Sequence, residues 1–253
     1  MAGAHRHLLV HGHSPLHRLA PEVKIAATFL FVVGVAITPR EAIWAFAIDA
    51  AVLLVLLAVA GYGVRQLLAR TTAVLPFIAF AFFIPFIASG EQTDVLWFSV
   101  SIDGLWATWN ILAKALIGFG ASLVLAGTTP IPEVIRGLGR LRVPPVIVSI
   151  LSFMFRYLDL IVEEMSRMRT AMVARAHDPR WLWQAKPIAS AAGALFVRSY
   201  ERGERVHAAM LARGFNGTIP QLDHRVATSG EWVLSMLVPL VSISAAIAAI
   251  AML

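Results

Sequence analysis

Two short tripeptides centred on arginine have a composition and position suited to binding another protein. They are Ala174-Arg175-Ala176 and Ala212-Arg213-Gly214, each at the C-terminal end of a long, charged stretch with helical character. Arginine offers a rigid fork of donors to carboxylates and backbone carbonyls, and small neighbours leave it room to enter a groove. One such arginine alone is equally well explained as a cap that favours the negative end of the helix dipole. Two in matching settings predict a pair of docking points.

The histidines suggest metal binding but do not predict a specific site. Five of the eight lie near the N-terminus, at His5, His7, His11, His13 and His17. Imidazole is a common ligand for transition metals. No aspartate or glutamate precedes Glu22, and a flexible tail does not fix coordination geometry. We therefore expect weak surface chelation or no role, and assign no metal ligand in this chain.

Two ionisable side chains, Asp49 and Lys114, fall inside apolar stretches. Charged groups within a membrane usually mark a transport path or a mutual ion pair. Asp49 could alternatively lie near the outer end of its helix. All three interpretations remain open from the sequence.

No catalytic or nucleotide-binding motif is present. The sequence lacks the phosphate-binding pattern G-x-x-x-x-G-K-[ST], the zinc motif H-E-x-x-H and the nucleophile motif G-x-S-x-G. The chain is therefore not expected to be an enzyme or to bind a cofactor. Any ATP hydrolysis linked to it must occur in a partner.

The composition predicts that membrane-spanning helices position these residues. Of 253 residues, 58% are hydrophobic and 14% charged, and the mean hydropathy is +0.75. Soluble domains average about 25% charged residues. Cysteine is absent, which excludes disulfides and thiolate metal sites. Residues 1–22 lack the apolar core of a signal peptide, so we interpret them as an uncleaved, His-rich cytoplasmic segment.

The predicted fold class is an all-α polytopic membrane protein with about five transmembrane helices. Most apolar segments have the roughly 20 residues that a bilayer core requires. Lys24, at the start of the first, is expected to extend its ammonium towards the interface. The predicted spans are 23–38, 41–63, 72–90, 104–127 and 231–253.

The net charge of +6 is concentrated in one internal block. Residues 128–229 contain 14 Lys and Arg against 8 Asp and Glu, whereas the rest contains 7 of each. Basic segments of membrane proteins usually face the cytoplasm. The rule places the N-terminus and this block in the cytoplasm and the C-terminus outside. Nucleic acid is a poor partner for a block that also carries eight acids and strong apolar periodicity.

The block itself is predicted to contain two long crossing helices. Pro144-Pro145 opens one that runs to about Ala176, and Pro187 opens another that runs to about Ala212. Each changes from apolar to charged along its length. Small residues at Ala189, Ser190, Gly193 and Ala194 predict the crossing point. The predicted organisation is a segment 1–22, a four-helix membrane region 23–127, coupling helices 128–229 and a final membrane helix 230–253.

These features together resemble the transmembrane T component of energy-coupling-factor transporters, in particular the cobalt-type CbiQ, over nearly the whole chain. The matching stretches include the opening Ser14-Pro15-Leu16-His17-Arg18-Leu19 with Pro21 and Lys24, Leu75-Pro76-Phe77 with Pro85-Phe86, Thr129-Pro130, Leu141-Arg142-Val143-Pro144, Phe155-Arg156-Tyr157, Glu163-Glu164 and the two tripeptides.

The resemblance implies a scaffold that joins two ATP-binding-cassette ATPases to a substrate-binding membrane subunit, possibly with a small accessory membrane subunit. In this family the signature arginines dock into the ATPases, which implies that role for Arg175 and Arg213. One departure is Ala176, where the family usually has glycine. Alanine favours helix over glycine by about 1 kcal/mol, so we expect the first helix to continue towards Pro179.

The expected function is thus a coupling subunit of an ATP-driven cobalt importer in the cell (inner) membrane, with ATP at the partners and Co²⁺ as the transported ion. A nickel importer of the same kind is the nearest alternative. A stand-alone secondary permease would require inverted repeats and paired charges, which we do not see. An intramembrane enzyme would need clustered catalytic side chains within the spans.

Overall fold

The computed structural model describes residues 14–63, 70, 72–87, 92–95, 98–176, 186–217 and 226–252. The chain divides into two compact units. We call His5–Gly137 with Arg225–Leu253 the apolar unit. Leu138–His224, grouped with Met1–Ala4, form the charged unit.

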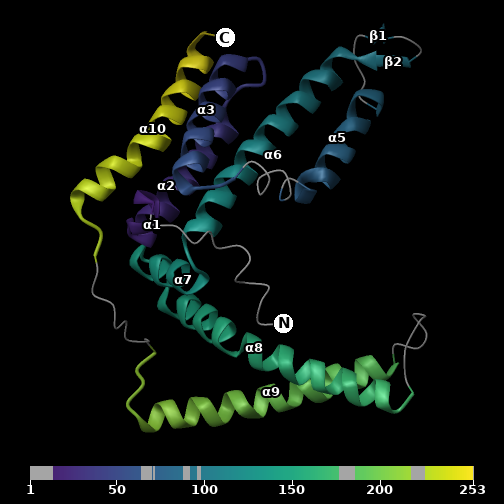
Figure 1. The fold of residues 1–253 in the computed structure, drawn as a ribbon, viewed down its shortest axis with the longest axis vertical. Coiled ribbons are helices and arrows are strands. Elements are labelled where there is room, and N and C mark those ends of the chain that lie inside the picture. The colour runs from purple at the N-terminus through teal and green to yellow at the C-terminus, as the bar shows by residue number, and fades with distance from the viewer. Residues whose placement is uncertain are drawn as a thin grey trace. The chain divides into compact units, whose positions relative to one another are not determined.

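Helices make up most of the described apolar unit (Figure 1). Its elements are α1 (Pro15–Arg18), α2 (Pro21–Ile37), α3 (Ile43–Ala60), the 3₁₀ turn η1 (Thr72–Val74), α5 (Leu75–Ile87), β1 (Gln92–Val95), β2 (Phe98–Ser101), α6 (Ile102–Thr128) and α10 (Ser229–Met252). Helix α7 (Ile131–Arg140) leads towards the charged unit. The two strands pair as an antiparallel hairpin, with Gln92 opposite Ser101. The all-α class is confirmed apart from this hairpin.

Local sequence explains where the helices begin and end. Pro21 lies in the first turn of α2, where its missing N–H costs nothing. Ser101 caps α6, its hydroxyl accepting a hydrogen bond from the Gly104 N–H at 3.3 Å. Gly61 ends α3 with a φ of 81°, a conformation that glycine adopts without strain.

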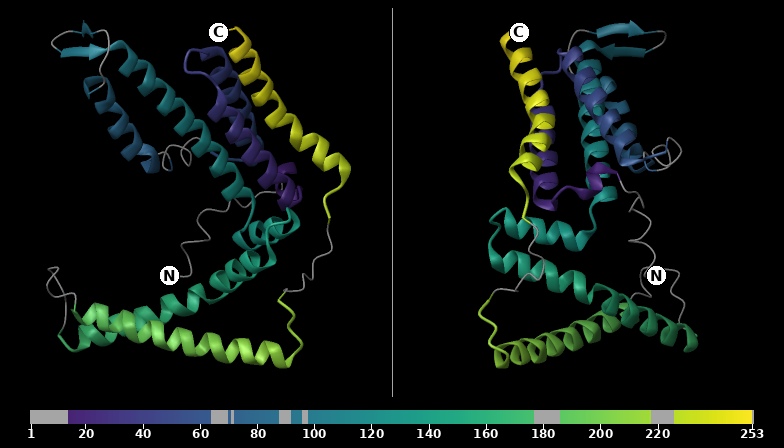
Figure 2. Two further views of the ribbon diagram at one scale, coloured as in Figure 1. Left: turned by 180° about the vertical axis from the view of Figure 1, so that it is seen from behind. Right: turned by 60° about the vertical axis from the view of Figure 1, so that its left-hand side comes forward.

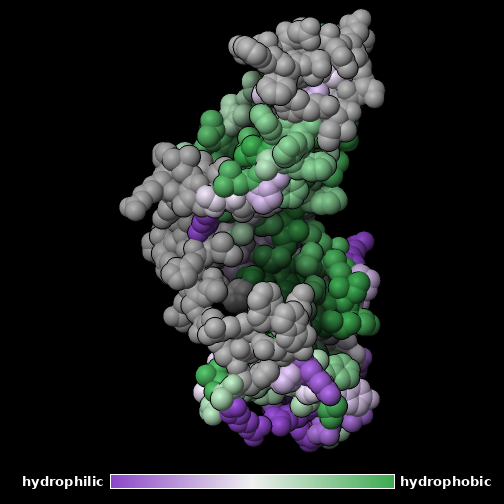
Figure 3. All heavy atoms as spheres, turned by 90° about the vertical axis from the view of Figure 1, so that its right-hand side faces the viewer, coloured by the Kyte–Doolittle hydropathy of each residue, from purple (hydrophilic) through white to green (hydrophobic). Residues whose placement is uncertain are grey.

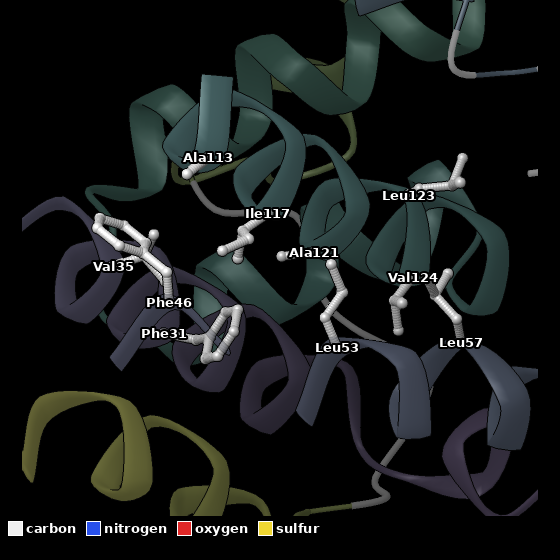
Figure 4. Close-up of a cluster of buried hydrophobic side chains, with 10 residues drawn as sticks. All are labelled: Phe31, Val35, Phe46, Leu53, Leu57, Ala113, Ile117, Ala121, Leu123 and Val124. Atoms are coloured by element: carbon white, nitrogen blue, oxygen red, sulfur yellow. The ribbon is translucent and has the colours of Figure 1, made fainter. Parts of the chain in front are cut away.

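The main core lies between α2, α3 and α6, as Figure 4 shows. Gly120 of α6 permits this close packing, because a Cβ there would lie 2.5 Å from Leu53 Cδ2 of α3. Helix α10 packs mainly against α2, where Gly34 faces Ser242. The core side chains are Phe31, Val35, Phe46, Leu53, Leu57, Ala113, Ile117, Ala121, Leu123 and Val124.

Large apolar side chains also cover the outside of the apolar unit. On α5, Phe80 is 71% exposed, and on α2 Phe29 is 68% exposed. Figure 3 shows hydrophobic residues, in green, gathered on one face. Exposed apolar area of this extent is rare on soluble monomers and is what a helix bundle presents to lipid.

Four helices are long and apolar enough to cross a bilayer: α3, α6, α10 and α8 (Pro145–Ala174). The polytopic class is therefore confirmed. The individual spans differ from the expected five. Helix α2 has 17 residues and α5 has 13, whereas α8, which we assigned to the charged block, has 30. Length and composition alone qualify α8, which also carries Arg156 and Asp159.

The charged unit is built on α8 and α9 (Lys186–Ala212). At about 1.5 Å per residue, each is roughly 40 Å or more in length. The two helices meet towards the C-terminal half of α8 and diverge towards its N-terminus (Figures 1 and 2). Both expected helices are present, with starts within one residue of Pro144 and Pro187.

Candidate functional site

The two tripeptides occupy the same place at the ends of α8 and α9. Ala174 and Ala212 are the last helical residues, and the arginine follows directly. Arg175 N–H donates to Met172 O at 3.1 Å, and Arg213 N–H donates to Met210 O at 3.0 Å. The two arginines are therefore presented by equivalent helix ends.

The third residue of each tripeptide turns the chain out of the helix. Gly214 has a φ of 81°, and its N–H donates to Leu211 O while that of Phe215 donates to Met210 O. This pair of bonds is a Schellman cap. Ala176 has a φ of 59°, and its N–H donates to Val173 O at 2.9 Å. Ala176 thus adopts the left-handed conformation usually left to glycine.

The expected continuation of α8 past Ala176 is wrong, because the helix ends at Ala174. The propensity of alanine for helix, about 1 kcal/mol over glycine, is too small to extend the helix here. Residues 177–180, including Pro179, lie outside the described residues.

Both arginine side chains are open to solvent. All six residues of the tripeptides are exposed. Within the described part of the chain, neither guanidinium forms an ion pair or a hydrogen bond. Ten donors in total, five on each side chain, are thus available to groups on another molecule.

A partly buried acid joins the two helices that carry the tripeptides. Glu164 of α8, whose side chain is 13% exposed, contacts Arg198 at 3.3 Å and Arg202 at 3.8 Å, both on α9. Ion pairs between residues four apart also form within each helix, Glu163 with Arg167 in α8 and Glu201 with Arg205 in α9.

The contact between α8 and α9 lies elsewhere than predicted. Ala189, Ser190, Gly193 and Ala194 are exposed, and a Cβ on Gly193 would meet nothing within 4 Å. The crossing at small residues is therefore a wrong prediction. The partly buried stripe of α9 runs instead through Leu195, Ser199, Arg202, Val206 and Met210, where an ion pair and larger side chains supply the contact.

The helices run in opposite directions, so their arginine ends lie at opposite ends of the pair. Near the C-terminus of α9, Met210 and His207 line a groove of about 380 Å³ with Phe153 and Tyr157 of α8. Glu164, further along α8, contacts the earlier residue Arg198. Arg213 consequently lies at the open side of the pair and Arg175 beyond the crossing.

The intramembrane ionisable residues are not paired with each other. Lys114 donates to the backbone carbonyl of Ala36 at 2.8 Å. Asp49 is fully buried near Ser242, and among the described residues neither of its carboxylate oxygens has a hydrogen-bond partner. The suggested mutual neutralisation is therefore wrong.

The histidine tail contributes no described site. His5, His7, His11 and His13 lie outside the described residues. His17 is described, and its Nδ1 lies 2.7 Å from Ser14 Oγ. Among the described residues, no group of three or more His, Cys, Asp or Glu could hold a metal ion.

Two further polar residues, Glu22 and Lys24, were not recognised as a site in the sequence. Lys24 is 7% exposed and donates to Thr128 O, at the end of α6, at 3.1 Å. Glu22 is 3% exposed and accepts a hydrogen bond from Ala227 N–H at 3.1 Å. A Glu and a Lys in the first turn of an otherwise apolar helix are the signal that could have indicated buried, paired charges.

Comparison with known proteins yields a family match over most of the chain. A family profile described as cobalt transport protein, CbiQ, matches residues 12–224. An uncharacterised protein of Methanocaldococcus jannaschii is 27% identical over 149 residues, which is 55% of this chain and 56% of that protein.

Two relatives with informative names are also similar. The cobalt transport protein CbiQ of Rhodobacter capsulatus is 34% identical over 106 residues, 42% of this chain and 43% of that protein. The energy-coupling factor transporter transmembrane protein EcfT of Staphylococcus aureus is 22% identical over 233 residues, 84% of both chains. The chain thus spans about half the length of the first and second of these three relatives and most of the third.

Proposed function

Because the chain belongs to the CbiQ family of cobalt transport proteins, we propose that it is the transmembrane coupling subunit of an ATP-driven importer of the energy-coupling-factor type. In this proposal two ATP-binding-cassette ATPases bind α8 and α9, and a membrane subunit captures the substrate. The chain itself hydrolyses nothing. It converts closure of the ATPase pair into movement of the substrate subunit.

The single observation that carries the proposal is the equivalence of the two helix ends. Arg175 and Arg213 follow the last helical residue of α8 and α9, are exposed, and lack partners among the described residues. Exposure to water alone does not explain why both helices end in an exposed arginine between small residues. Two equivalent ATPase subunits present two equivalent acceptor sites, which matches the repeat.

The proposed cargo is Co²⁺, with Ni²⁺ as the alternative. Support for cobalt comes from the name of the matched family. The chain is not proposed to bind the ion itself, because a coupling subunit need not contact the cargo. The proposed location is the cell (inner) membrane, with the N-terminus and the block 128–229 in the cytoplasm, as the loop charges support.

The test is copurification and uptake with substitutions at the two arginines. Truncating a buried charged partner at an interface costs about 2–5 kcal/mol, so Arg175→Ala and Arg213→Ala should each weaken ATPase binding, and the double variant should lose it. Uptake of Co²⁺ and Ni²⁺ by cells that carry the whole complex should fall in parallel. Arg205→Ala is the matched control, because Arg205 is also exposed on α9 but pairs with Glu201.

A double variant that keeps its ATPases and takes up metal normally would overturn the docking role. A wild-type chain that purifies without any nucleotide-binding partner and transports on an ion gradient would instead indicate a secondary permease.

A further inference from the structure

The first turn of α2 contacts both chain connections of the charged block. Lys24 Nζ donates to the carbonyl of Thr128, the last residue of α6. Glu22 Oε1 accepts from the N–H of Ala227, two residues before α10 begins at Ser229. The chain runs from Thr128 into α7, leaves the apolar unit after Gly137 and returns to it at Arg225, just before Ala227. One helical turn therefore binds both the outgoing and the returning segment.

Helix α7 also packs directly on this turn. A Cβ on Gly137 would lie 2.8 Å from Ile25 Cδ1, 3.0 Å from Glu22 N and 3.1 Å from the carbonyl carbon of Pro21. Only glycine fits such an approach without displacing backbone atoms. Pro21–Ile25, Thr128, Gly137 and Ala227 thus form one buried cluster, which we call the α2 junction.

The two charges of the junction lie where helix dipoles favour them. The Lys24 ammonium is at the C-terminus of α6, and the Glu22 carboxylate is in the first turn of α2 and beside the start of α10. Cations are favoured at helix C-termini and anions at N-termini. Both residues are more than nine-tenths buried, so the loss of either bond would remove a hydrogen bond from a buried charged group.

The junction borders a space into which it could shift. Lys24 and Thr128 line a cavity of about 250 Å³ together with Thr28, Phe31 and Ser235. A close-packed interior transmits displacement rather than absorbing it, but a contact at the edge of a cavity can take up a second position. The bond that holds the outgoing segment is at such an edge.

We propose that the α2 junction carries movement of the charged block into the membrane helices, with Glu22 and Lys24 as its positioning residues. This inference rests on the proposed coupling function. Displacement of the segments at Thr128 and Ala227 would act on the same turn of α2, and α2 packs against both α6 and α10. The junction would therefore move α2, α6 and α10 together.

The test compares two lysines that make the same kind of bond at different places. Lys24 and Lys114 each link α2 and α6 by donating to a backbone carbonyl, Lys24 to Thr128 O and Lys114 to Ala36 O. Lys24 is at the junction, and Lys114 is at the other end of α2. Lys24→Met and Lys114→Met therefore each remove one bond from a lysine to a backbone carbonyl, a buried bond at the junction for Lys24 and an exposed bond away from it for Lys114.

The expected result is an uncoupled transporter for Lys24→Met only. In the complete complex, this variant should keep its ATPase subunits and its ATP hydrolysis, while Co²⁺ uptake falls by about tenfold or more, as loss of a charge-assisted bond at a buried site implies. Lys114→Met should keep uptake within about twofold of wild type. Lys24→Arg retains a donor and should take up more Co²⁺ than Lys24→Met. Glu22→Gln retains an acceptor and should likewise keep part of the uptake.

Three results would overturn the inference. They are normal uptake by Lys24→Met, equal losses in both lysine variants, or loss of bound ATPase from Lys24→Met. The Tm of each purified variant distinguishes a failure to fold from a loss of coupling. We expect Lys24→Arg to fold normally. Copurification with the wild-type chain tests the coupling function separately. A wild-type chain that binds no ATPase would overturn that function, whatever the lysine variants show.

Discussion

Ala176 and Gly214 hold the same left-handed backbone conformation at the ends of two different helices, with φ of 59° and 81°. Glycine adopts this conformation freely, whereas an L-residue pays a steric cost of about 1–2 kcal/mol. The backbone at Ala176, after α8, is therefore strained, whereas the backbone at Gly214, after α9, is not. The strain is confined to one methyl group.

Replacing Ala176 with glycine should stabilise the protein. We expect Ala176→Gly to raise the free energy of unfolding by about 1 kcal/mol, which the Tm of the purified protein in detergent measures. Gly214→Ala should lower it by a similar amount. Ala174→Gly is the control, because the same substitution in the last helical turn should destabilise by about 0.5–1 kcal/mol. A neutral or destabilising Ala176→Gly contradicts the expectation.

The contact between α8 and α9 should depend on Glu164. Its partly buried carboxylate faces both Arg198 and Arg202, and Glu164→Gln leaves two like charges without their common partner. We expect the link between the helices to weaken by about 1 kcal/mol, measured as a wider distance between spin labels on α8 and α9. Glu163→Gln should change this distance little, since Glu163 is exposed and pairs only within α8. Equal effects of both variants would contradict a special role for Glu164.

The stability of the apolar unit should fall at alkaline pH through Tyr62. Its hydroxyl donates to Leu123 O at 2.7 Å and accepts from Arg70 Nη1 at 3.0 Å. Burial raises the pKa of Tyr62 above its ordinary value of 10.0, and the Arg70 charge partly offsets this rise. A raised folded-state pKa means that the contribution is complete below pH 10 and is lost as the pH climbs through the folded value.

The measurement is Tm as a function of pH for wild type and Tyr62→Phe. The variant should be less stable by about 1 kcal/mol at neutral pH, and its Tm should decline less above pH 10. Two other tyrosines, Tyr157 and Tyr200, remain in both proteins. Identical alkaline profiles would show that Tyr62 does not control the transition.

The packing of α2 against α10 should respond to a paired substitution. A methyl group on Gly34 would lie 2.7 Å from Ser242 Oγ and 3.1 Å from its Cβ. Gly34→Ala should therefore destabilise by about 1–3 kcal/mol. In the background of Ser242→Ala, which removes the nearer atom, the cost should be smaller. Equal costs in both backgrounds, measured by Tm, would rule out this contact as the cause.

The sequence predicted the features that depend on local chemistry. Pro144-Pro145 and Pro187 indicated where α8 and α9 begin, because the backbone preference of proline acts over one or two residues. The pairs Glu163–Arg167 and Glu201–Arg205 follow from spacing alone, because residues four apart are neighbours on a helix surface. The family match supports the same overall interpretation over residues 12–224.

Features that depend on contacts between distant segments were not predictable in the same way. Lys24 and Thr128 are 104 residues apart, and the sequence around either residue does not predict its contact with the other. Small residues at Ala189 and Gly193 permit a helix crossing but do not require one, and the ion pairs of Glu164 determine the contact instead. The conformation of Ala176 reflects a helix end imposed by its surroundings rather than by its own preference.

The antiparallel course of α8 and α9 has a consequence for symmetry. Two like helices that run in opposite directions are related by an approximate two-fold rotation, and most protein dimers have a true two-fold axis. In the proposed complex, one copy of this chain can therefore offer the same structural element to each half of an ATPase dimer. Ala176 and Gly214 share one backbone conformation but differ by a methyl group, so the two helix ends present slightly different surfaces to the two halves of that dimer.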